Sequence, residues 1–269
     1  MTARQIMQAS EGFERPLGSL SVARSELLSL VRRGLLRRQE IPRIGPGECE
    51  RRYFLSRRAR RVAPEVSDLP RRASVTRPLG LAQMDHALGV SEFLSLLHRD
   101  CARSQGRARL LRTLGDRELA MRVDASRYGL ENGLVVPDAT VLLELEGAPQ
   151  LLFLELMNRG GVIRPGIPAS ISRSFVAKLW RYKALVKSLD QSSELKRLVG
   201  AEQCPMPPGF RVLVVSIRGP EHMEHLRLAA DSFRTLCYFA RIDELKKGSS
   251  MLLDPVWALP QGLVRAIVD

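Results

Sequence analysis

The first 62 residues combine helical spacing with two short strand-like runs. Between residues 21 and 34, Leu27, Leu28 and Val31 fall on one face of a helix, with Ser21 as a candidate N-cap and Gly34 as a candidate stop. Residues 35–41 and 51–56 form two short runs on either side of a basic turn segment. The pattern therefore predicts a helix followed by a β-hairpin.

After a proline-containing stretch, the rest of the chain alternates between helical and strand patterns. Residues 63–78 contain prolines and few apolar residues, which is typical of a linker. Helices are predicted at residues 79–103, 172–189 and 221–233, and strands at 118–123, 134–143, 150–156, 210–217 and 236–240. An antiparallel meander followed by β-α-β crossovers predicts an α/β (α+β) fold, a mixed sheet with helices on both faces. The predicted parts are a domain 1–62, a linker 63–78 and a domain 79–269.

The positive charge of the chain is concentrated near its beginning. The whole chain carries a formal net charge of +13. Residues 1–80 hold seventeen arginines, no lysine and eight acids, a net of +9, which leaves +4 for the remaining 189 residues. Basic residues concentrated in one segment indicate a polyanionic partner, with DNA as the first candidate and RNA as the alternative.

Other features of the sequence exclude several classes of protein. No apolar run approaches the roughly 20 residues that cross a bilayer, and the first ten residues do not form a secretory signal, so no membrane association and a cytoplasmic location are expected. The four cysteines are widely spaced and form no CxxC pair, which favours reduced, packed thiols (Cys49, Cys101, Cys204 and Cys237).

The order of a helix, an Arg-Arg-Gly-Leu-Leu-Arg-Arg run and a hairpin ending in Tyr-Phe-Leu-Ser resembles a winged helix-turn-helix domain. In that family the helix before the hairpin enters the major groove, and the hairpin touches the DNA backbone or the minor groove. The resemblance implies short first helices near residues 3–9 and 17–19. It also implies DNA contacts by two groups of residues, the helix residues Arg24, Ser25, Ser29 and Arg32, and the phosphate-binding Arg43, Arg51, Arg52, Arg57 and Arg58. A winged helix used for protein pairing is the alternative, and the charge argues against it.

Two acids stand within apolar strand patterns of the second domain. Asp138 follows Pro137 on one run, and Glu155 interrupts another. Burying an unpaired carboxylate costs several kcal/mol, so Glu155 needs a cation as its partner. The candidates are a metal ion, Lys178 or an arginine of residues 159–173. A purely structural ion pair of Glu155 with Lys178 or Arg181 explains the pattern without catalysis.

With the strand order, these residues resemble the PD-(D/E)XK restriction-endonuclease-like fold. Its chemistry uses two acids at adjacent strand ends to hold Mg²⁺, which activates water and stabilises the charged phosphate, with a lysine nearby. The resemblance implies Asp138 and Glu155 as metal ligands and, with Lys178, as the catalytic set. Met157 stands where the family has its lysine, and no lysine precedes Lys178, so Lys178 is the best replacement and Lys183 the second.

The combination of the two domains resembles the replication-relaxation family of plasmids and integrative elements. The motifs that carry this resemblance lie at residues 33–36, 53–55, 85–90, 137–138, 153–155 and 178–182. It implies a DNA-binding protein of a mobile genetic element, acting in replication control or DNA processing with a degenerate nuclease-like domain. Double-stranded DNA, other replication or mobilisation proteins and a second copy in a dimer are the expected partners. The alternatives are a Mg²⁺-dependent nuclease or nicking relaxase, and a transcriptional repressor with a sensing or dimerising second domain.

Overall fold

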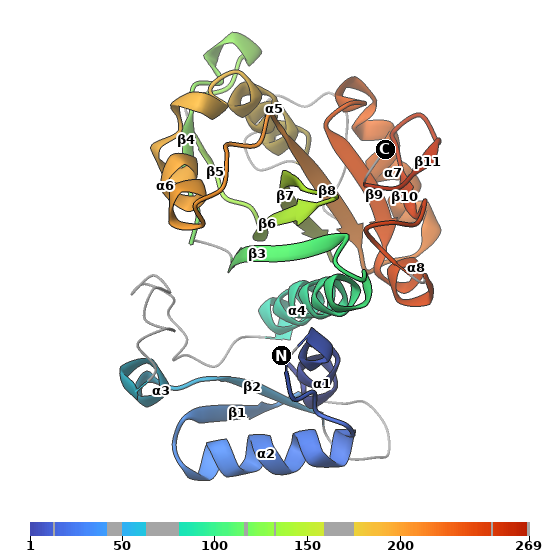
Figure 1. Ribbon diagram of the computed structural model, residues 1–269. Helices are drawn as coiled ribbons and strands as arrows, with labels where there is room; N and C mark the ends of the chain where they lie inside the picture. The colour runs from blue at the N-terminus through green and yellow to red at the C-terminus, as the bar shows by residue number, and fades with distance from the viewer. Residues whose placement is uncertain are drawn as a thin grey trace. The chain divides into compact units, whose positions relative to one another are not determined.

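The computed structural model divides the chain into two compact units, Met1–Arg103 and Ser104–Asp269 (Figure 1). The structure describes residues 1–12, 14–41, 50–62, 81–115, 118–131, 133–158, 175–248 and 250–267. It has a mixed α/β content, and none of the helices within these ranges is long and apolar enough to cross a membrane.

The first unit begins with two helices that share a small core. Helix α1 (Ala3–Ala9) starts with a capping box, in which Thr2 and Gln5 each accept a hydrogen bond from the backbone of the other. Helix α2 (Leu20–Arg32) starts at Ser19, whose hydroxyl accepts from the Val22 N–H. The buried residues Ala3 and Leu27 bring the two helices together against the following hairpin. A 3₁₀ turn, η1 (Ser10–Gly12), follows α1.

A β-hairpin follows α2, as the sequence predicts. Gly34 ends the helix with φ +71°, a conformation that glycine adopts without steric cost. Strands β1 (Leu36–Glu40) and β2 (Arg51–Leu55) pair antiparallel, and the buried Tyr53 joins the core of the two helices. A short helix, α3 (Arg57–Val62), follows β2 where the sequence pattern predicts only the basic end of a strand.

Two details of the first unit differ from the sequence-based expectations. The N-cap of α2 is Ser19 rather than Ser21, because the helix begins earlier and its first turn holds the partly buried Leu20. The expected short helix at residues 17–19 is wrong, since these residues form no helix and Ser19, which is extended, supplies the cap of α2. The turn between the strands, with Arg43, and the predicted linker 63–78 lie outside the described residues.

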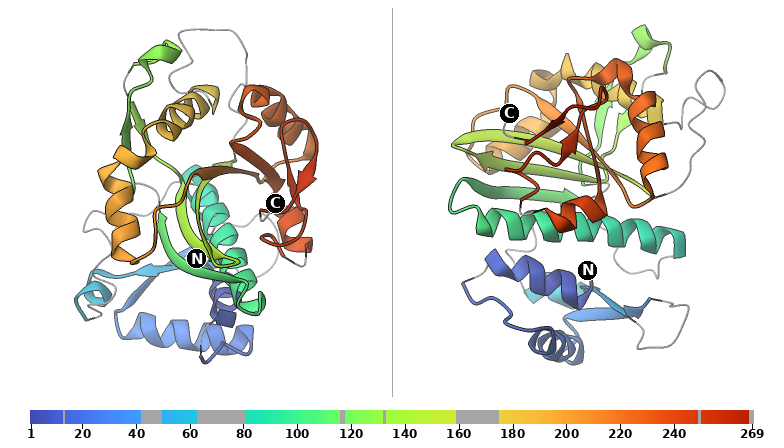
Figure 2. Two further views of the ribbon diagram at one scale, coloured as in Figure 1. Left: turned by 45° about the horizontal axis from the view of Figure 1, so that its top comes forward. Right: turned by 90° about the vertical axis from the view of Figure 1, so that its right-hand side faces the viewer.

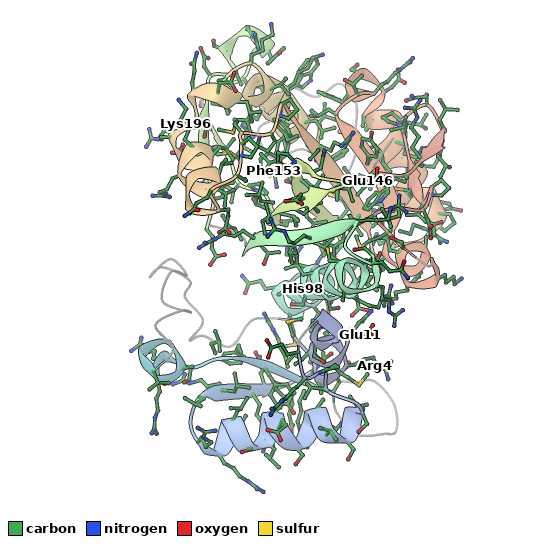
Figure 3. The ribbon with its side chains drawn as sticks, in the orientation of Figure 1. Arg4, Glu11, His98, Glu146, Phe153 and Lys196 are labelled. Carbon is green, nitrogen blue, oxygen red and sulfur yellow. The ribbon has the colours of Figure 1, made fainter. Side chains whose placement is uncertain are left out.

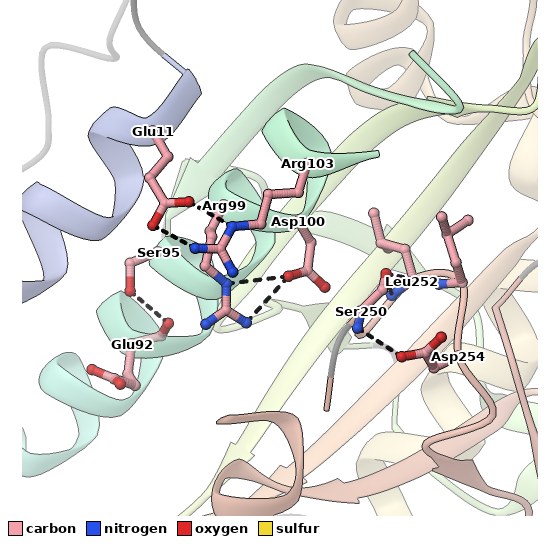
Figure 4. Close-up of polar contacts among 10 residues, drawn as sticks. Glu11, Glu92, Ser95, Arg99, Asp100, Arg103, Ser250, Leu252 and Asp254 are labelled. Atoms are coloured by element: carbon pink, nitrogen blue, oxygen red, sulfur yellow. Dashed lines mark hydrogen bonds and ion pairs between the residues drawn. The ribbon is translucent and has the colours of Figure 1, made fainter. Parts of the chain in front are cut away.

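The long helix α4 (Leu81–Arg103) belongs to the first unit, whereas the sequence analysis placed it at the start of the second domain. It runs as one continuous helix (Figure 2). The side chain of Gln5 donates to the Glu92 carboxylate at 2.8 Å, and Arg103 forms a two-point ion pair with Glu11 (Figure 4). These contacts with α1 and its following turn are the physical reason for the shifted boundary.

The second unit is built on a mixed seven-stranded sheet with the order β11-β10-β9-β8-β7-β6-β3. Strands β3, β6 and β7 are antiparallel, while β7, β8 and β9 are parallel. The bounds are β3 (Ala108–Gly115), β6 (Ala139–Leu145), β7 (Ala148–Met157), β8 (Phe210–Ser216), β9 (Cys237–Arg241), β10 (Trp257–Ala258) and β11 (Val264–Arg265). The predicted antiparallel pairing of β6 with β7 and the parallel crossovers from β7 to β8 and from β8 to β9 are therefore confirmed.

Three helices cover one face of this sheet. Helices α5 (Phe175–Val186) and α6 (Ser193–Ala201) connect β7 to β8, and α7 (Pro220–Ala229) connects β8 to β9. Their apolar residues form one core with alternate residues of the central strands, including Phe153 of β7 and Val214 of β8. Helix α8 (Ile242–Lys247) follows β9, and short 3₁₀ turns lie at η3 (Ser126–Tyr128), η5 (Leu189–Gln191) and η6 (Asp231–Phe233).

The first strand of the sheet is not the one that the sequence predicts. The expected strand 118–123 contributes only β4 (Met121–Val123), which pairs with β5 (Gly133–Val135) in a separate two-stranded ribbon. The place beside β6 is taken by β3, whose central residues are mostly half-buried rather than alternating. A register shift between Leu110 and Arg112 explains why the pattern of β3 lacks a clear period of two.

Candidate functional site

Asp138 and Glu155 lie opposite each other on two paired strands of the sheet. The register pairs Ala139 of β6 with Leu154 of β7, so Asp138, one residue earlier, stands beside Glu155, one residue later. The Asp138 N–H donates to the Leu154 carbonyl at 3.0 Å and continues the ladder by one bond. The fold thus brings together the two acids that the sequence analysis singled out.

Glu155 is buried and is held by two side chains of α5. Its side chain lies on the same face of β7 as Phe153, the face that the helices cover, and the residue is 3% exposed. Lys178 donates to Oε2 of Glu155 at 2.5 Å, and the Tyr182 hydroxyl donates to Oε1 at 2.5 Å. Lys178 and Tyr182 are four residues apart and therefore share one face of the helix.

The position of Tyr182 follows from aromatic packing. Its ring stacks on Phe153, with centroids 5.5 Å apart, and also contacts Phe210 at 6.0 Å. Because Phe153 and Glu155 are two residues apart on one strand, a ring stacked on the first places its hydroxyl at the second. Helix α5 therefore supplies both Lys178 of the ion pair and Tyr182 of the aromatic core.

Burial raises the pKa of Glu155 to about 7. The positive charge of Lys178 lowers this pKa, whereas the negative charge of Asp138 raises it. The hydrogen bonds from Lys178 and Tyr182 also lower it. The pKa of Tyr182 is raised well above its ordinary value by burial and by the charge of Glu155. Burial also raises the pKa of Cys237, so this thiol of β9 is not a reactive one.

Asp138 has a structural role that is visible in its hydrogen bond. Its Oδ2 accepts from the Leu156 N–H at 2.7 Å. Because strand β6 begins only at Ala139, this side-chain bond links Asp138 to β7 just beyond the paired residues of the two strands. Asp138 is half-buried, in contrast to Glu155.

The arrangement of these oxygens fits Mg²⁺ poorly. The ion needs near-octahedral oxygen ligands at about 2.0–2.1 Å, and it keeps several waters. Both oxygens of the nearly inaccessible Glu155 already accept hydrogen bonds, from Lys178 and Tyr182, and one oxygen of Asp138 is bonded to the backbone. A hydrated cation would therefore compete with Lys178 and Tyr182 for the oxygens of Glu155.

The structure distinguishes between the two lysines considered for the site. Lys178 contacts Glu155, whereas Lys183 lies over the rings of Trp180 and Phe233, at 4.9 and 5.7 Å from their centroids. Met157, where the resemblance expects a lysine, packs partly buried against the apolar core. Tyr182 was missed by the sequence analysis, although its spacing of four from Lys178 was a usable signal.

In the first unit, the predicted DNA-facing residues of α2 are exposed. Ser25, Ser29 and Arg32 lie at positions i, i+4 and i+7, on the helix face opposite the buried Ala23 and Leu27. Arg24 is also exposed, at the border of the buried face. The face holds hydroxyl and guanidinium groups, which suit phosphate and base-edge contacts.

Among the hairpin and α3 arginines whose side chains the structure describes, all but Arg52 are exposed. Arg51, Arg57 and Arg58 are exposed, and Arg51 lies 3.9 Å from Glu40 across the hairpin. Arg52 is half-buried, and burial lowers its pKa, so it is less accessible to a phosphate than the resemblance implied. Thr2 forms an isolated antiparallel bridge with the backbone of Arg52, which places the start of the chain beside this residue. Arg43 lies outside the described residues.

Comparisons with protein-family models, with curated proteins and with solved structures gave no match.

Proposed function

We propose that the chain is a cytoplasmic DNA-binding protein that grips double-stranded DNA with its first unit, in the manner of a winged helix. The observation that carries this proposal is the exposed face of α2, with its hydroxyl and guanidinium groups, together with the exposed arginines of the hairpin and α3 in the same unit. Cationic side chains on one helix and an adjoining hairpin supply the phosphate contacts that dominate DNA affinity. The resemblance to the replication-relaxation family supports a role in replication control or DNA processing of a mobile element.

We infer that the second unit is a nuclease-like domain that does not cleave. The PD-(D/E)XK resemblance places Asp138 and Glu155 as metal ligands. Both oxygens of Glu155, which would ligate the cation, already accept hydrogen bonds from Lys178 and Tyr182, and this supports the inference. A closed, nearly inaccessible carboxylate supports a structural role for this cluster, since buried charges require such partners.

Duplex binding is tested by fluorescence anisotropy with a labelled DNA hairpin over a range of salt concentrations. Arg32→Gln should weaken binding and reduce the slope of log affinity against log salt by about 0.9, the value for one phosphate contact. The matched control is Arg103→Gln in the same unit, because Glu11 already balances the charge of that arginine. Equal losses in both variants would refute the assignment of α2 to the DNA interface.

The nuclease alternative is favoured by one observation, the juxtaposition of Asp138 and Glu155 on paired strands. It is tested by incubating supercoiled plasmid with the protein and Mg²⁺ or Mn²⁺. Under our proposal no nicked product forms. Nicking that is abolished by Asp138→Asn would establish the enzyme instead. A repressor would bind its own promoter tightly and would be indifferent to Asp138→Asn.

A further inference from the structure

The second unit carries a group of aromatic rings and cations that neither the Glu155 cluster nor duplex binding uses. Tyr128 of η3 lies 4.7 Å from Trp180 of α5 between ring centroids, at an interplanar angle of 33°. Trp180 meets Phe233 of η6 edge-on at 4.9 Å. Three segments far apart in the sequence therefore build one aromatic row.

One cation stands over Tyr128, and another stands over Trp180. The guanidinium carbon of Arg127 is 4.6 Å from the centroid of Tyr128, and Nζ of Lys183 is 4.9 Å from that of Trp180. Arg127 is exposed, Tyr128, Trp180 and Lys183 are half-buried, and Phe233 is 3% exposed. The row is thus anchored at Phe233 and opens to solvent at Arg127. These contacts lie within the range of cation–π interactions.

The two cations differ in their carboxylate neighbours. Within the described ranges, neither Arg127 nor Lys183 forms an ion pair. Asp231, in the same 3₁₀ turn as Phe233, pairs with Arg234 at 2.8 Å. Asp124 accepts from the Ser126 N–H at 3.0 Å, and the hydrogen bonds of Ser126 and the charge of Arg127 lower the pKa of Asp124, so this acid offsets part of the charge of Arg127 while Lys183 keeps its own. A positive, aromatic surface of this kind is complementary to a chain that carries both phosphates and accessible base faces.

The surface is separate from the Glu155 cluster although both use α5. Trp180 and Lys183 are three residues apart and share one face of the helix, whereas Lys178 and Tyr182 share another. Substitutions at Arg127, Trp180 or Lys183 therefore leave the contacts of Glu155 in place.

We propose that Tyr128 and Trp180, with Arg127 and Lys183, bind single-stranded DNA by stacking unpaired bases and holding the adjoining phosphates. A duplex keeps its bases stacked on one another, so it cannot present base faces to this row. An unpaired strand presents them freely, and stacking on aromatic or guanidinium planes tolerates any base. The choice of DNA over RNA rests on the proposed function, while the preference for an unpaired strand rests on the ring and cation geometry alone.

Tryptophan fluorescence of the full chain provides a direct readout. The chain has two tryptophans, and Trp257 is fully buried with its indole N–H bonded to the Met251 carbonyl, so a contact quench reports on Trp180. We expect an oligo(dT) of about 20 nucleotides to quench this fluorescence even after a DNA hairpin has saturated the first unit. An abasic oligonucleotide with the same number of phosphates should bind at least tenfold more weakly, because stacking contributes about 1–3 kcal/mol per base.

Variants separate stacking from charge. Trp180→Phe should retain oligonucleotide binding, measured by anisotropy, and lose the quench, while Trp180→Ala should weaken binding about tenfold. Lys183→Gln should weaken binding and reduce the salt slope by about 0.7, the value for one phosphate of a single strand. The control Lys196→Gln removes an exposed charge from α6 of the same unit (Figure 3) and should change neither. Arg127→Gln, at an exposed position, tests the surface even if Trp180→Ala does not fold.

Several results would overturn the proposal. The abasic strand could bind as tightly as oligo(dT), or Lys183→Gln and Lys196→Gln could lose the same affinity for the oligonucleotide. The duplex could displace the oligonucleotide, or oligo(rU) could bind tenfold more tightly than oligo(dT). Loss of duplex binding alone would count against the proposed function of the first unit and would leave the quench by oligo(dT) unchanged. The two failures are therefore distinguishable.

Discussion

Replacing Lys178 by methionine should destabilise the second unit by an amount that grows with pH. The substitution removes the ammonium group that donates to Oε2 of Glu155, while Tyr182 and Asp138 stay in place. Lys178 lowers the pKa of Glu155 against the larger, opposite effect of burial. Without it, the carboxylate is left buried without a cationic partner, and its pKa rises above the value of about 7 that it has in the intact pair.

The sign of the pH dependence follows from proton linkage. A carboxyl whose pKa is raised by folding contributes stability that is full below its unfolded pKa and is lost as pH rises to its folded pKa. For the wild type this window runs from about 4.5 to about 7, and it corresponds to about 3 kcal/mol. In the variant the loss continues above pH 7, by up to about 1.4 kcal/mol per pH unit until the new pKa is reached. The side chain of Lys178 is 28% exposed, and solvent therefore weakens the effect. We expect the loss in free energy of unfolding caused by Lys178→Met to be about 2 kcal/mol larger at pH 8.5 than at pH 6.

Urea unfolding followed by tryptophan fluorescence measures this difference in the correct unit. Trp180 and Trp257 both lie between Ser104 and Asp269, so the signal reports the second unit. Lys196→Met, an exposed lysine on α6, is the matched control and should show no pH-dependent loss. The double variant Glu155→Gln/Lys178→Met should abolish the dependence. Equal destabilisation by Lys178→Met at pH 6 and pH 8.5 would refute the assignment of the charged pair.

Two further predictions concern the same helix. Tyr182→Phe removes the donor to Oε1 of Glu155. In urea unfolding it should destabilise the second unit by about 1.5–3 kcal/mol at pH 8.5 and by less at pH 6. A loss that does not depend on pH would count against this hydrogen bond to a charged group. Gly133→Ala would place a Cβ 2.8 Å from Nε of Arg181 and should lower the melting temperature, at a cost of about 1–3 kcal/mol. Gly219→Ala, whose Cβ would meet nothing within 4 Å, is the control, and an equal shift in both variants would contradict the packing argument.

Much of the architecture could be predicted because it depends on local patterns. The amphipathic face of α2 and the glycine that ends it are properties of a few neighbouring residues, and so are the apolar runs of β6, β7 and β8. Strand β3 could not be recognised in this way, because its register shift and half-buried residues remove the period of two. Helix α4 has a clear helical pattern, but its grouping with the first unit depends on contacts with residues more than 80 positions away.

The candidate site shows the same division. The sequence by itself determined that a carboxylate at position 155, on an apolar strand, must have a cationic partner, because burying it alone costs too much free energy. It also limited any lysine partner to Lys178 or later positions. Only the tertiary structure decided that Lys178 and Tyr182 are the partners and that Lys183 is not. That choice depends on how α5 is rotated against β7, and the rotation is set by the stacking of Tyr182 on Phe153, a contact between residues 29 positions apart.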